Sequence, residues 1–104
     1  MTIGEFQQAI RSIYYERDRA RGVLAAYAWL NEEAGELARA IRSGDAGALT
    51  TEMSDVLAWL TTLANLLDVD LEAAASRFAQ GCPKCGNTPC SCPDGAQSTL
   101  AECP

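Results

Sequence analysis

The sequence predicts an all-α protein of about four helices with a central antiparallel helical hairpin, assembling into a bundle, plus a short cysteine-rich C-terminal tail. In residues 1–80, apolar side chains recur every three or four positions, as on one face of an α-helix. The same region lacks the alternation and the Val/Ile/Thr-rich runs that are typical of strands. All five cysteines of the 104-residue chain follow residue 81, in a segment rich in Gly, Pro and Ser. We therefore expect an all-α domain over residues 1–80 and a separate tail over residues 81–104.

The first helix is predicted from Ile3, Phe6, Ile10 and Ile13, which lie three or four residues apart. The polar segment RDRARG, residues 17–22, follows these positions. We interpret it as a corner between the first and second helices.

The second and third helices each carry an apolar seam whose members step by 4, 3, 4, 3 and 4 residues. The members are Val23, Tyr27, Leu30, Ala34, Leu37 and Ile41 in the second helix, and Leu49, Met53, Val56, Leu60, Leu63 and Leu67 in the third. Between them lies SGDAG, residues 43–47, with the glycine signal of a helix C-cap and turn. With these coiled-coil-like seams, we expect the two helices to pack as an antiparallel hairpin. A short last helix, capped by Asp70, is expected to bury Leu71, Ala74 and Phe78.

Acidic side chains form a second stripe beside each seam, next to a tryptophan. The stripes hold Trp29, Glu33 and Glu36 in the second helix, and Glu52, Asp55 and Trp59 in the third. Facing residues of an antiparallel hairpin have a constant total of residue numbers, and this total is 88 for three pairs. The pairs are Trp29 with Trp59, Glu33 with Asp55, and Glu36 with Glu52. The hairpin should therefore stack two layers of acid pairs, with a tryptophan pair one turn below.

Four carboxylates held together repel one another, because each pair at 4 Å costs about 4 kcal/mol at an effective dielectric constant near 20. The total stability of a small domain is roughly 5–15 kcal/mol, so such a cluster needs cations. No lysine occurs before Lys84. Oxygen ligands without His or Cys favour Mg²⁺ or Mn²⁺, and we predict a divalent metal at the facing acids.

The alternative is a solvated acidic face, which is the usual fate of helical glutamates. Five acids on two helices in matching register, with Glu32 as the fifth, favour the metal site over that alternative. Gly35 adds weight, because glycine inside a helix costs about 1 kcal/mol relative to alanine. Close approach of a ligand or of another helix would account for it.

The segments EEAGE, residues 32–36, and EMSD, residues 52–55, resemble the EExxE…ExxD signature of the MazG-like nucleotide pyrophosphohydrolases, a group of all-α nucleoside triphosphate pyrophosphatases. Fifteen residues separate the two halves. The resemblance covers about residues 3–80, and the cysteine-rich tail is similar to one found on a branch of the family. It implies Mg²⁺-dependent hydrolysis of a nucleoside triphosphate to the monophosphate and pyrophosphate, in the control of nucleotide pools.

Carried over by position, the resemblance implies that Glu33, Glu36, Glu52 and Asp55 bind the catalytic metal. Glu32 matches the first glutamate of the signature and is expected to bind a further metal or to orient the attacking water. Together these five acids are the expected catalytic residues. Family members assemble as dimers or tetramers, often with the site completed across an interface, so a homodimer or homotetramer is expected.

Further residues are candidates for contacts with the nucleotide. The aromatic candidates for stacking on a base are Phe6, Tyr14, Trp29 and Trp59. Aromatic residues at helical spacing usually belong to a core, which is the alternative for each of them. Many family members hold the phosphates with a lysine and an asparagine beyond the second motif, and this chain has Asn65 and Arg77 there but no lysine.

The cysteine tail has a second set of candidate metal ligands. Cys82, Cys85, Cys90 and Cys92 are spaced as CxxC, four residues and then CxC, which is typical of a zinc knuckle. In a reducing compartment, four close thiolates favour a structural Zn²⁺ over disulfides. The alternatives are a disordered tail and disulfides formed after purification. Cys103 is left over and is expected to be unligated.

The net charge of −6 argues against a nucleic-acid polymer or an anionic membrane as partner. An anionic nucleotide is compatible with it, because bound cations invert the local field. The absence of histidine excludes Ser-His and Cys-His catalytic pairs. We see no signal peptide and no membrane-spanning stretch, and expect a cytoplasmic protein. The competing function is a non-enzymatic acidic helical module that binds divalent cations and docks a protein partner through its zinc knuckle.

Overall fold

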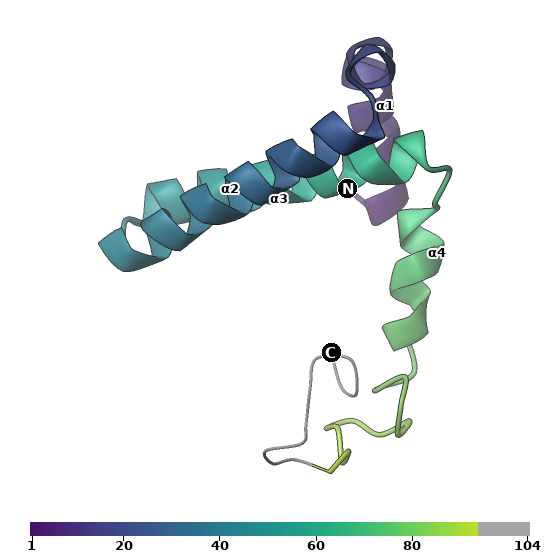
Figure 1. The fold of residues 1–104 in the computed structure, drawn as a ribbon. Coiled ribbons are helices and arrows are strands. Elements are labelled where there is room, and N and C mark those ends of the chain that lie inside the picture. Colours follow the sequence, from purple (N-terminus) through teal and green to yellow (C-terminus); the bar gives the residue numbers. More distant parts are fainter. Residues whose placement is uncertain (94–104) are drawn as a thin grey trace. The chain divides into compact units, whose positions relative to one another are not determined.

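A computed structural model describes residues 1–93 of the chain. Its helices are α1 (Ile3–Arg21), α2 (Val23–Ser43), α3 (Ala46–Leu66) and α4 (Leu71–Ala75), followed by a 3-10 helix at Ser76–Phe78 (Figure 1). No strand occurs within residues 1–93, so the all-α prediction is confirmed. A first compact unit, Met1–Leu71, holds α1 to α3, and a second unit begins at Glu72. The two units are described separately, and the boundary expected after residue 80 stays a prediction.

Helix α1 begins at a capping box. The Thr2 hydroxyl accepts a hydrogen bond from the Glu5 backbone N–H, and the Glu5 carboxylate accepts one from the Thr2 N–H. These bonds favour the charged carboxylate and lower the pKa of Glu5. The predicted corner at residues 17–22 is wrong, because α1 continues to Arg21 and breaks only at Gly22. Arginine favours the helix and suits its C-terminal dipole, whereas Gly22 adopts a φ of 91° that side chains rarely allow.

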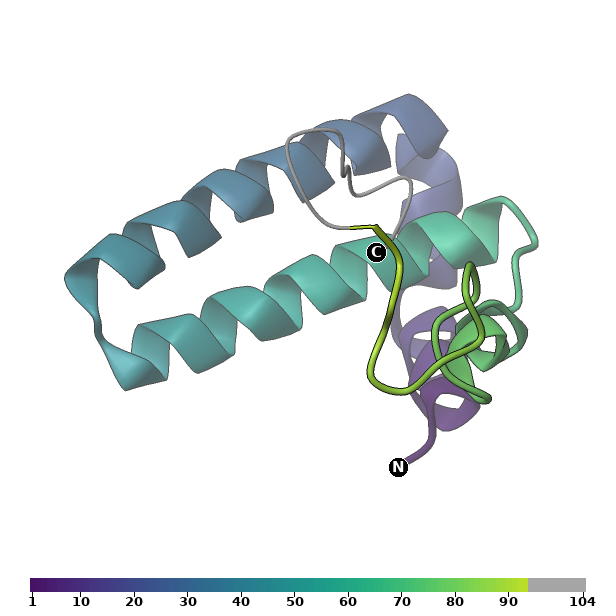
Figure 2. The same ribbon diagram turned by 90° about the horizontal axis from the view of Figure 1, so that it is seen from below.

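The turn between α2 and α3 forms where the sequence predicts it. Gly44, with φ 70°, ends α2 in the left-handed conformation, and its N–H bonds the carbonyl of Ala40. The Asp45 carboxylate caps α3 by accepting from the N–H groups of Gly47 and Ala48. Helices α2 and α3 then run side by side in opposite directions, as both views show (Figures 1 and 2).

The hairpin register that the residue numbers predict is confirmed. The rings of Trp29 and Trp59 stack with centroids 5.9 Å apart and planes 13° from parallel. Ala26 and Thr62, whose numbers also total 88, are both completely or almost completely buried. Ala40 is likewise buried, near the turn end of the same stripe. The stripe of acids and tryptophans therefore lies along the contact between α2 and α3, with small residues closing both of its ends.

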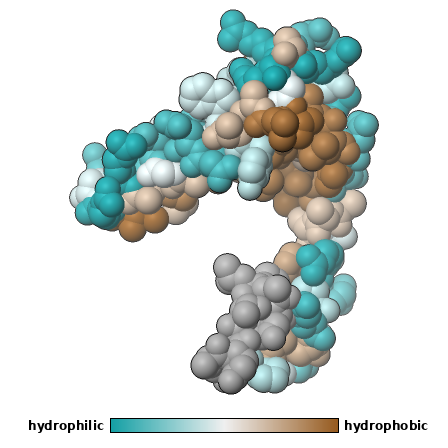
Figure 3. All heavy atoms as spheres, viewed as in Figure 1, coloured by the Kyte–Doolittle hydropathy of each residue, from teal (hydrophilic) through white to brown (hydrophobic). Residues whose placement is uncertain are grey.

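The apolar seams are only partly buried within the described residues. Seven seam members are exposed: Val23, Tyr27, Ala34, Ile41, Met53, Leu60 and Leu67. Leu63 alone among the twelve is buried. Apolar side chains gather over the hairpin end nearest α1, with a smaller group near the turn (Figure 3). The acidic stripe and the seam lie on different sides of each hairpin helix, so among the described residues much of each seam is left exposed. No described helix combines the length and the apolar composition that crossing a membrane requires.

Helix α1 contacts both hairpin helices at the end far from the turn, and it is fixed to α3 by polar contacts (Figure 2). The Gln7 side chain donates to Asn65 Oδ1 at 3.1 Å and to the Val69 carbonyl at 2.8 Å, and accepts from the Leu71 N–H at 2.9 Å. Thr62 donates its hydroxyl to the buried Asp18 carboxylate at 2.9 Å. These bonds set the position of α1 against the same end of α3 that carries Trp59.

The expectation that the last helix buries Leu71, Ala74 and Phe78 is wrong. Leu71 is half-buried, Ala74 is exposed, and Phe78 is 48% exposed. The helix has only five residues, three of them alanine, so it offers little apolar surface to bury. Phe78 instead carries the Arg77 guanidinium over its ring, 5.3 Å from the centroid.

Candidate functional site

Three carboxylates meet in the middle of the α2–α3 contact. Glu33 comes from α2, and Glu52 and Asp55 come from facing turns of α3. One oxygen from each lies within 4.8 Å of the others, and all three residues are half-buried. The tryptophan pair lies one turn away along the same stripe, as the register predicts.

This acid cluster is electrostatically strained. Burial raises the pKa of Glu33 above its ordinary value of 4.5, and the neighbouring Asp55, Glu52 and Glu36 raise it further. The oxygen Oε2 of Glu52 is buried and has no hydrogen-bond partner among the described residues. A buried unpaired carboxylate oxygen costs free energy unless a donor or a cation meets it. The donor set is all oxygen and carries excess negative charge, so the three residues fit a hard divalent cation such as Mg²⁺ or Mn²⁺.

The two other predicted acids are not in this group of three. Glu36 is half-buried one turn further along α2, and its carboxylate accepts a hydrogen bond from Arg39 at 2.8 Å. Glu32 is exposed. Gly35 lies between them in the sequence, and apart from its chain neighbours and the backbone of its own helix, no described atom is within 4 Å of the place where a Cβ would stand. Packing against residues 1–93 therefore does not account for this glycine.

The residues predicted to contact the nucleotide do not form one group in the structure. Trp29 and Trp59 stack beside the acid cluster, and Tyr14 is 43% exposed on α1. Phe6 is half-buried near the start of α1. Asn65 is buried and its amide is bonded to Gln7. Arg77 belongs to the second unit, where it covers the ring of Phe78.

A cavity of about 170 Å³ opens beside Asp55. Most of the residues that line it are not among the candidate site residues that the sequence predicts. Its lining is Tyr14, Arg17, Asp18, Arg21, Asp55, Ala58, Trp59 and Thr62. The Arg21 guanidinium bonds Asp18 at 2.9 Å and lies over the Trp59 ring, 4.8 Å from its centroid. The signal was present, because Arg17 and Arg21 share one helix face when α1 extends to residue 21. Interpreting residues 17–22 as a corner concealed it.

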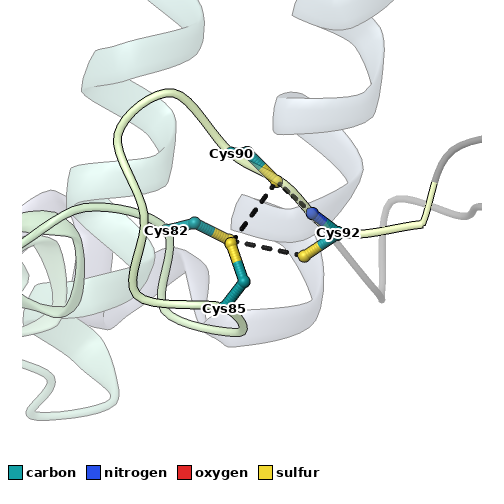
Figure 4. Close-up of side chains that lie close together, drawn as sticks. All are labelled: Cys82, Cys85, Cys90 and Cys92. Atoms are coloured by element: carbon teal, nitrogen blue, oxygen red, sulfur yellow. Dashed lines mark hydrogen bonds between the residues drawn. The ribbon is translucent and has the colours of Figure 1, made fainter.

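Four cysteines of the second unit converge, as the sequence predicts (Figure 4). One sulfur from each of Cys82, Cys85, Cys90 and Cys92 lies within 4.8 Å of all the others. The sulfurs of Cys82 and Cys92 are 3.7 Å apart, and those of Cys85 and Cys90 are 3.9 Å apart. No disulfide joins these four residues. They form a four-sulfur set that could hold one tetrahedral metal ion. Cys103 lies outside the described residues.

The loop between the cysteines brings backbone N–H groups to the sulfurs. The N–H of Ser91 donates to the Cys85 sulfur at 3.3 Å, and the N–H of Cys92 donates to the Cys90 sulfur at 3.3 Å. Backbone N–H groups of Ser91 and Asn87 lower the pKa of the Cys85 thiol to about 6, since they stabilise the thiolate. Gly81 turns the chain with a φ of 114°, and a side chain there would meet Thr88 Oγ1 at 2.7 Å.

The part of the chain that contains the acid cluster matches a known protein family. The family model of the MazG nucleotide pyrophosphohydrolase domain matches residues 21–84. The match includes both halves of the acidic motif, the tryptophan pair and the whole α2–α3 hairpin. A search of curated proteins found no match.

The raised pKa of Glu33 predicts how the stability of the metal-free protein depends on pH. Because the folded state binds this proton more tightly than the unfolded chain, the contribution of Glu33 to stability is largest at low pH. It is lost as the pH rises through the folded pKa, which lies above 4.5. At neutral pH in chelator, Glu33→Gln should therefore be more stable than the wild type, and the difference should vanish below 4.5.

Urea unfolding at a series of pH values measures this difference. Glu16→Gln is the matched control, because Glu16 is exposed on α1 and outside the cluster. Added Mg²⁺ should stabilise the wild type and the Glu16 variant at neutral pH, and Glu33→Gln much less. Equal pH profiles for the wild type and Glu33→Gln would contradict the strained cluster.

Proposed function

The chain belongs to the MazG nucleotide pyrophosphohydrolase family, and we propose that it hydrolyses nucleoside triphosphates to the monophosphate and pyrophosphate with Mg²⁺ or Mn²⁺. The observation that carries the proposal is the acid cluster Glu33, Glu52 and Asp55 with its unpartnered buried oxygen. The family match favours this enzyme over a non-enzymatic acidic module. Control of nucleotide pools is the cellular role that such a reaction suits.

The roles of the acids follow from their positions. Glu33, Glu52 and Asp55 would hold a divalent cation between α2 and α3. When bound, this cation supplies positive charge for the phosphate chain and lowers the pKa of the attacking water. Glu36 would complete the ligand set if its carboxylate were released from the exposed Arg39 side chain. Glu32, exposed beside the cluster, binds a further cation or orients the water toward the α-phosphorus.

The nucleotide contacts are proposed from the same geometry. Trp29 and Tyr14 are about half exposed and lie on the elements around the acids, which supports stacking on a base. Trp59 supports the Trp29 ring from α3. Phe6 and Arg77 remain candidates for substrate contact on sequence grounds. For Asn65, the bonds to Gln7 support a role in holding α1 against α3.

Glu52→Gln tests the metal-binding acids. Replacing a partner of a metal ligand typically costs 10–100-fold, so loss of a ligand should lower kcat/KM by at least about 100-fold. The helices should remain intact, because the amide keeps the shape of the side chain. The measurement is pyrophosphate release from a panel of nucleoside triphosphates with Mg²⁺, and Glu16→Gln is again the control.

The broken bond is identified with ¹⁸O-labelled water. Attack at the α-phosphorus places the label in the monophosphate, whereas attack at the γ-phosphorus places it in orthophosphate. Label in the monophosphate is the expected result. Release of a diphosphate and orthophosphate would disprove the proposed reaction, and no release from any triphosphate would favour the non-enzymatic module.

We also propose that the chain forms a homodimer or homotetramer. The exposed seam residues, such as Tyr27, Met53 and Leu60, would be covered by the corresponding helices of a second copy. Sedimentation equilibrium should give a mass of at least two chains. Leu60→Asp should shift the protein toward monomer, and Ser12→Asp on α1 should not. A monomeric wild type at micromolar concentration would contradict this assembly.

The four-sulfur set of the second unit is proposed to hold a structural Zn²⁺. Four thiolates complete a tetrahedral shell and leave no position for substrate. Such thiolates persist in a reducing compartment, which supports a cytoplasmic location.

Elemental analysis tests the zinc site. Protein purified under reducing conditions without chelator, from cells supplied with zinc, should contain about one zinc per chain. Cys85→Ser should lose most of this zinc, and Cys103→Ser should keep it. A zinc content near zero in the wild type would remove the site.

A further inference from the structure

We propose that Arg17 and Arg21 of α1 form a phosphate-binding subsite for the triphosphate, in the cavity next to Asp55. This inference deepens the proposed function, and it rests on that function for the identity of the substrate. It assigns the phosphate contacts to α1, although the sequence directed attention to residues beyond the second acidic motif.

The cavity joins the acid cluster to two guanidinium groups. Asp55 contributes to both, since it belongs to the group of three carboxylates and also lines the cavity with Arg17 and Arg21. An anion in the cavity would therefore touch the arginines on one side and a cation held by Asp55 on the other. Carboxylate-held cations and arginines are the two groups that proteins place around a transferring phosphoryl chain.

The size of the cavity suits phosphate groups better than a whole nucleotide. Its volume is about 170 Å³. Pockets that enclose a drug-sized ligand usually measure about 300–1,000 Å³. The ring of Trp59 in its wall already contacts the Trp29 ring and the Arg21 guanidinium. The remaining hydrogen-bond donors in the wall are chiefly those of the two arginines, and arginine matches phosphate oxygens in pairs.

Asp18 acts as a positioning residue for Arg21. It is 2% exposed, and its two oxygens bond Arg21 Nη1 and the Thr62 hydroxyl, each at 2.9 Å. A carboxylate at this depth is costly unless it is paired, so the bond holds Arg21 in one place. The Trp59 ring supports the same guanidinium. Arg21 uses one nitrogen for Asp18 and keeps further N–H groups for an anion.

Arg17 adds the charge that this ion pair lacks. It is exposed at the cavity and makes no hydrogen bond or ion pair with any residue in the described part of the chain. The two arginines and the two aspartates, Asp18 and Asp55, that line the cavity give it a formal charge of about zero. Glu33 and Glu52 beside Asp55 add two negative charges, which a divalent cation held by the three acids would offset. Phosphate binding is therefore expected to require the metal.

A second depression lies on the other flank of the acid cluster and is the rival location. Its lining includes Glu36, Arg39, Arg42 and Glu52. There Arg39 is already bonded to Glu36, and both arginines are exposed on α2 without a buried partner to position them. Arg21, by contrast, is held by the buried Asp18, and this favours the cavity beside α1 as the phosphate site.

The test is binding of inorganic tripolyphosphate, measured by calorimetry on the full chain in excess Mg²⁺. Tripolyphosphate has no base or sugar, so it reports on phosphate contacts alone and does not depend on turnover. Arg17→Gln should weaken binding about tenfold or more, the loss expected from one charge-assisted hydrogen bond. Arg19→Gln has the same charge change on another face of α1 and should bind like the wild type. Chelator should abolish wild-type binding.

The role of Asp18 is tested by a double-mutant cycle. Asp18→Asn should weaken tripolyphosphate binding when Arg21 is present and add nothing in an Arg21→Gln background. A merely structural Asp18 would weaken binding in both backgrounds. The double variant leaves no unpaired buried charge, so if Arg21→Gln alone unfolds, the double variant is compared with Asp18→Asn instead. Equal binding by these two would support the positioning role, and weaker binding by the double variant would contradict it.

The outcomes separate this inference from the proposed function. Hydrolysis by the wild type with tripolyphosphate binding unchanged in Arg17→Gln would overturn the inference and leave the function standing. Loss of binding in Arg42→Gln instead would overturn it in favour of the rival depression. Arginine-dependent binding without hydrolysis of any triphosphate would support the subsite and overturn the proposed reaction.

Discussion

The constraint on which the first unit depends is that α2 and α3 contact each other along a stripe that carries acids. Ala26 and Ala40 allow the helices to approach closely at its ends, and the two tryptophans stack within it. Among the described residues, no ion pair joins Glu33, Glu52 or Asp55 to a basic side chain, and the ion pair of Glu36 is with the exposed Arg39. Hairpin packing and cation binding are therefore energetically coupled. The packing that positions the acids also creates the repulsion between carboxylates that a cation would relieve.

Helix α1 responds to the same arrangement from one side. Its last turns bring an arginine pair to the end of the stripe, and the buried Asp18 fixes one of them through contacts with Arg21 and Thr62. Gln7 and Asn65 fix the other end of α1 with uncharged bonds. Helix α1 thus makes an uncharged contact near its start and a charged contact near the acids. The charged contact places both positive and negative side chains of α1 and α3 around the cavity.

The cysteine cluster differs from the acid cluster because its four ligands lie close together in the sequence. Eleven residues, 82–92, contain all four sulfurs, and their loop is shaped by glycines at positive φ and by N–H groups aimed at sulfur. Such a loop needs little support from a hydrophobic core, since a metal ion would replace the core as the source of stability. The second unit can therefore be understood by itself, and its site shares no ligand with the acid cluster.

The sequence by itself determined the order of the helices, the turn at Gly44, the pairing of Trp29 with Trp59, and the approach of Glu33 to Asp55 and of the four cysteines to one another. Helical period, turn chemistry and ligand spacing are local properties, which is why they can be read from the sequence. Only the tertiary structure decided which stripe of α2 faces α3. The pattern marks an apolar seam and an acidic stripe on the same helix, and the choice between them depends on the whole set of contacts rather than on either helix alone. The continuation of α1 to Arg21 was also decided there, since helix propensity and the contacts of Asp18 outweigh the polar character of the segment. That continuation places two arginines beside Asp55, a proximity that no spacing within the sequence encodes because it arises from the crossing of α1 and α3.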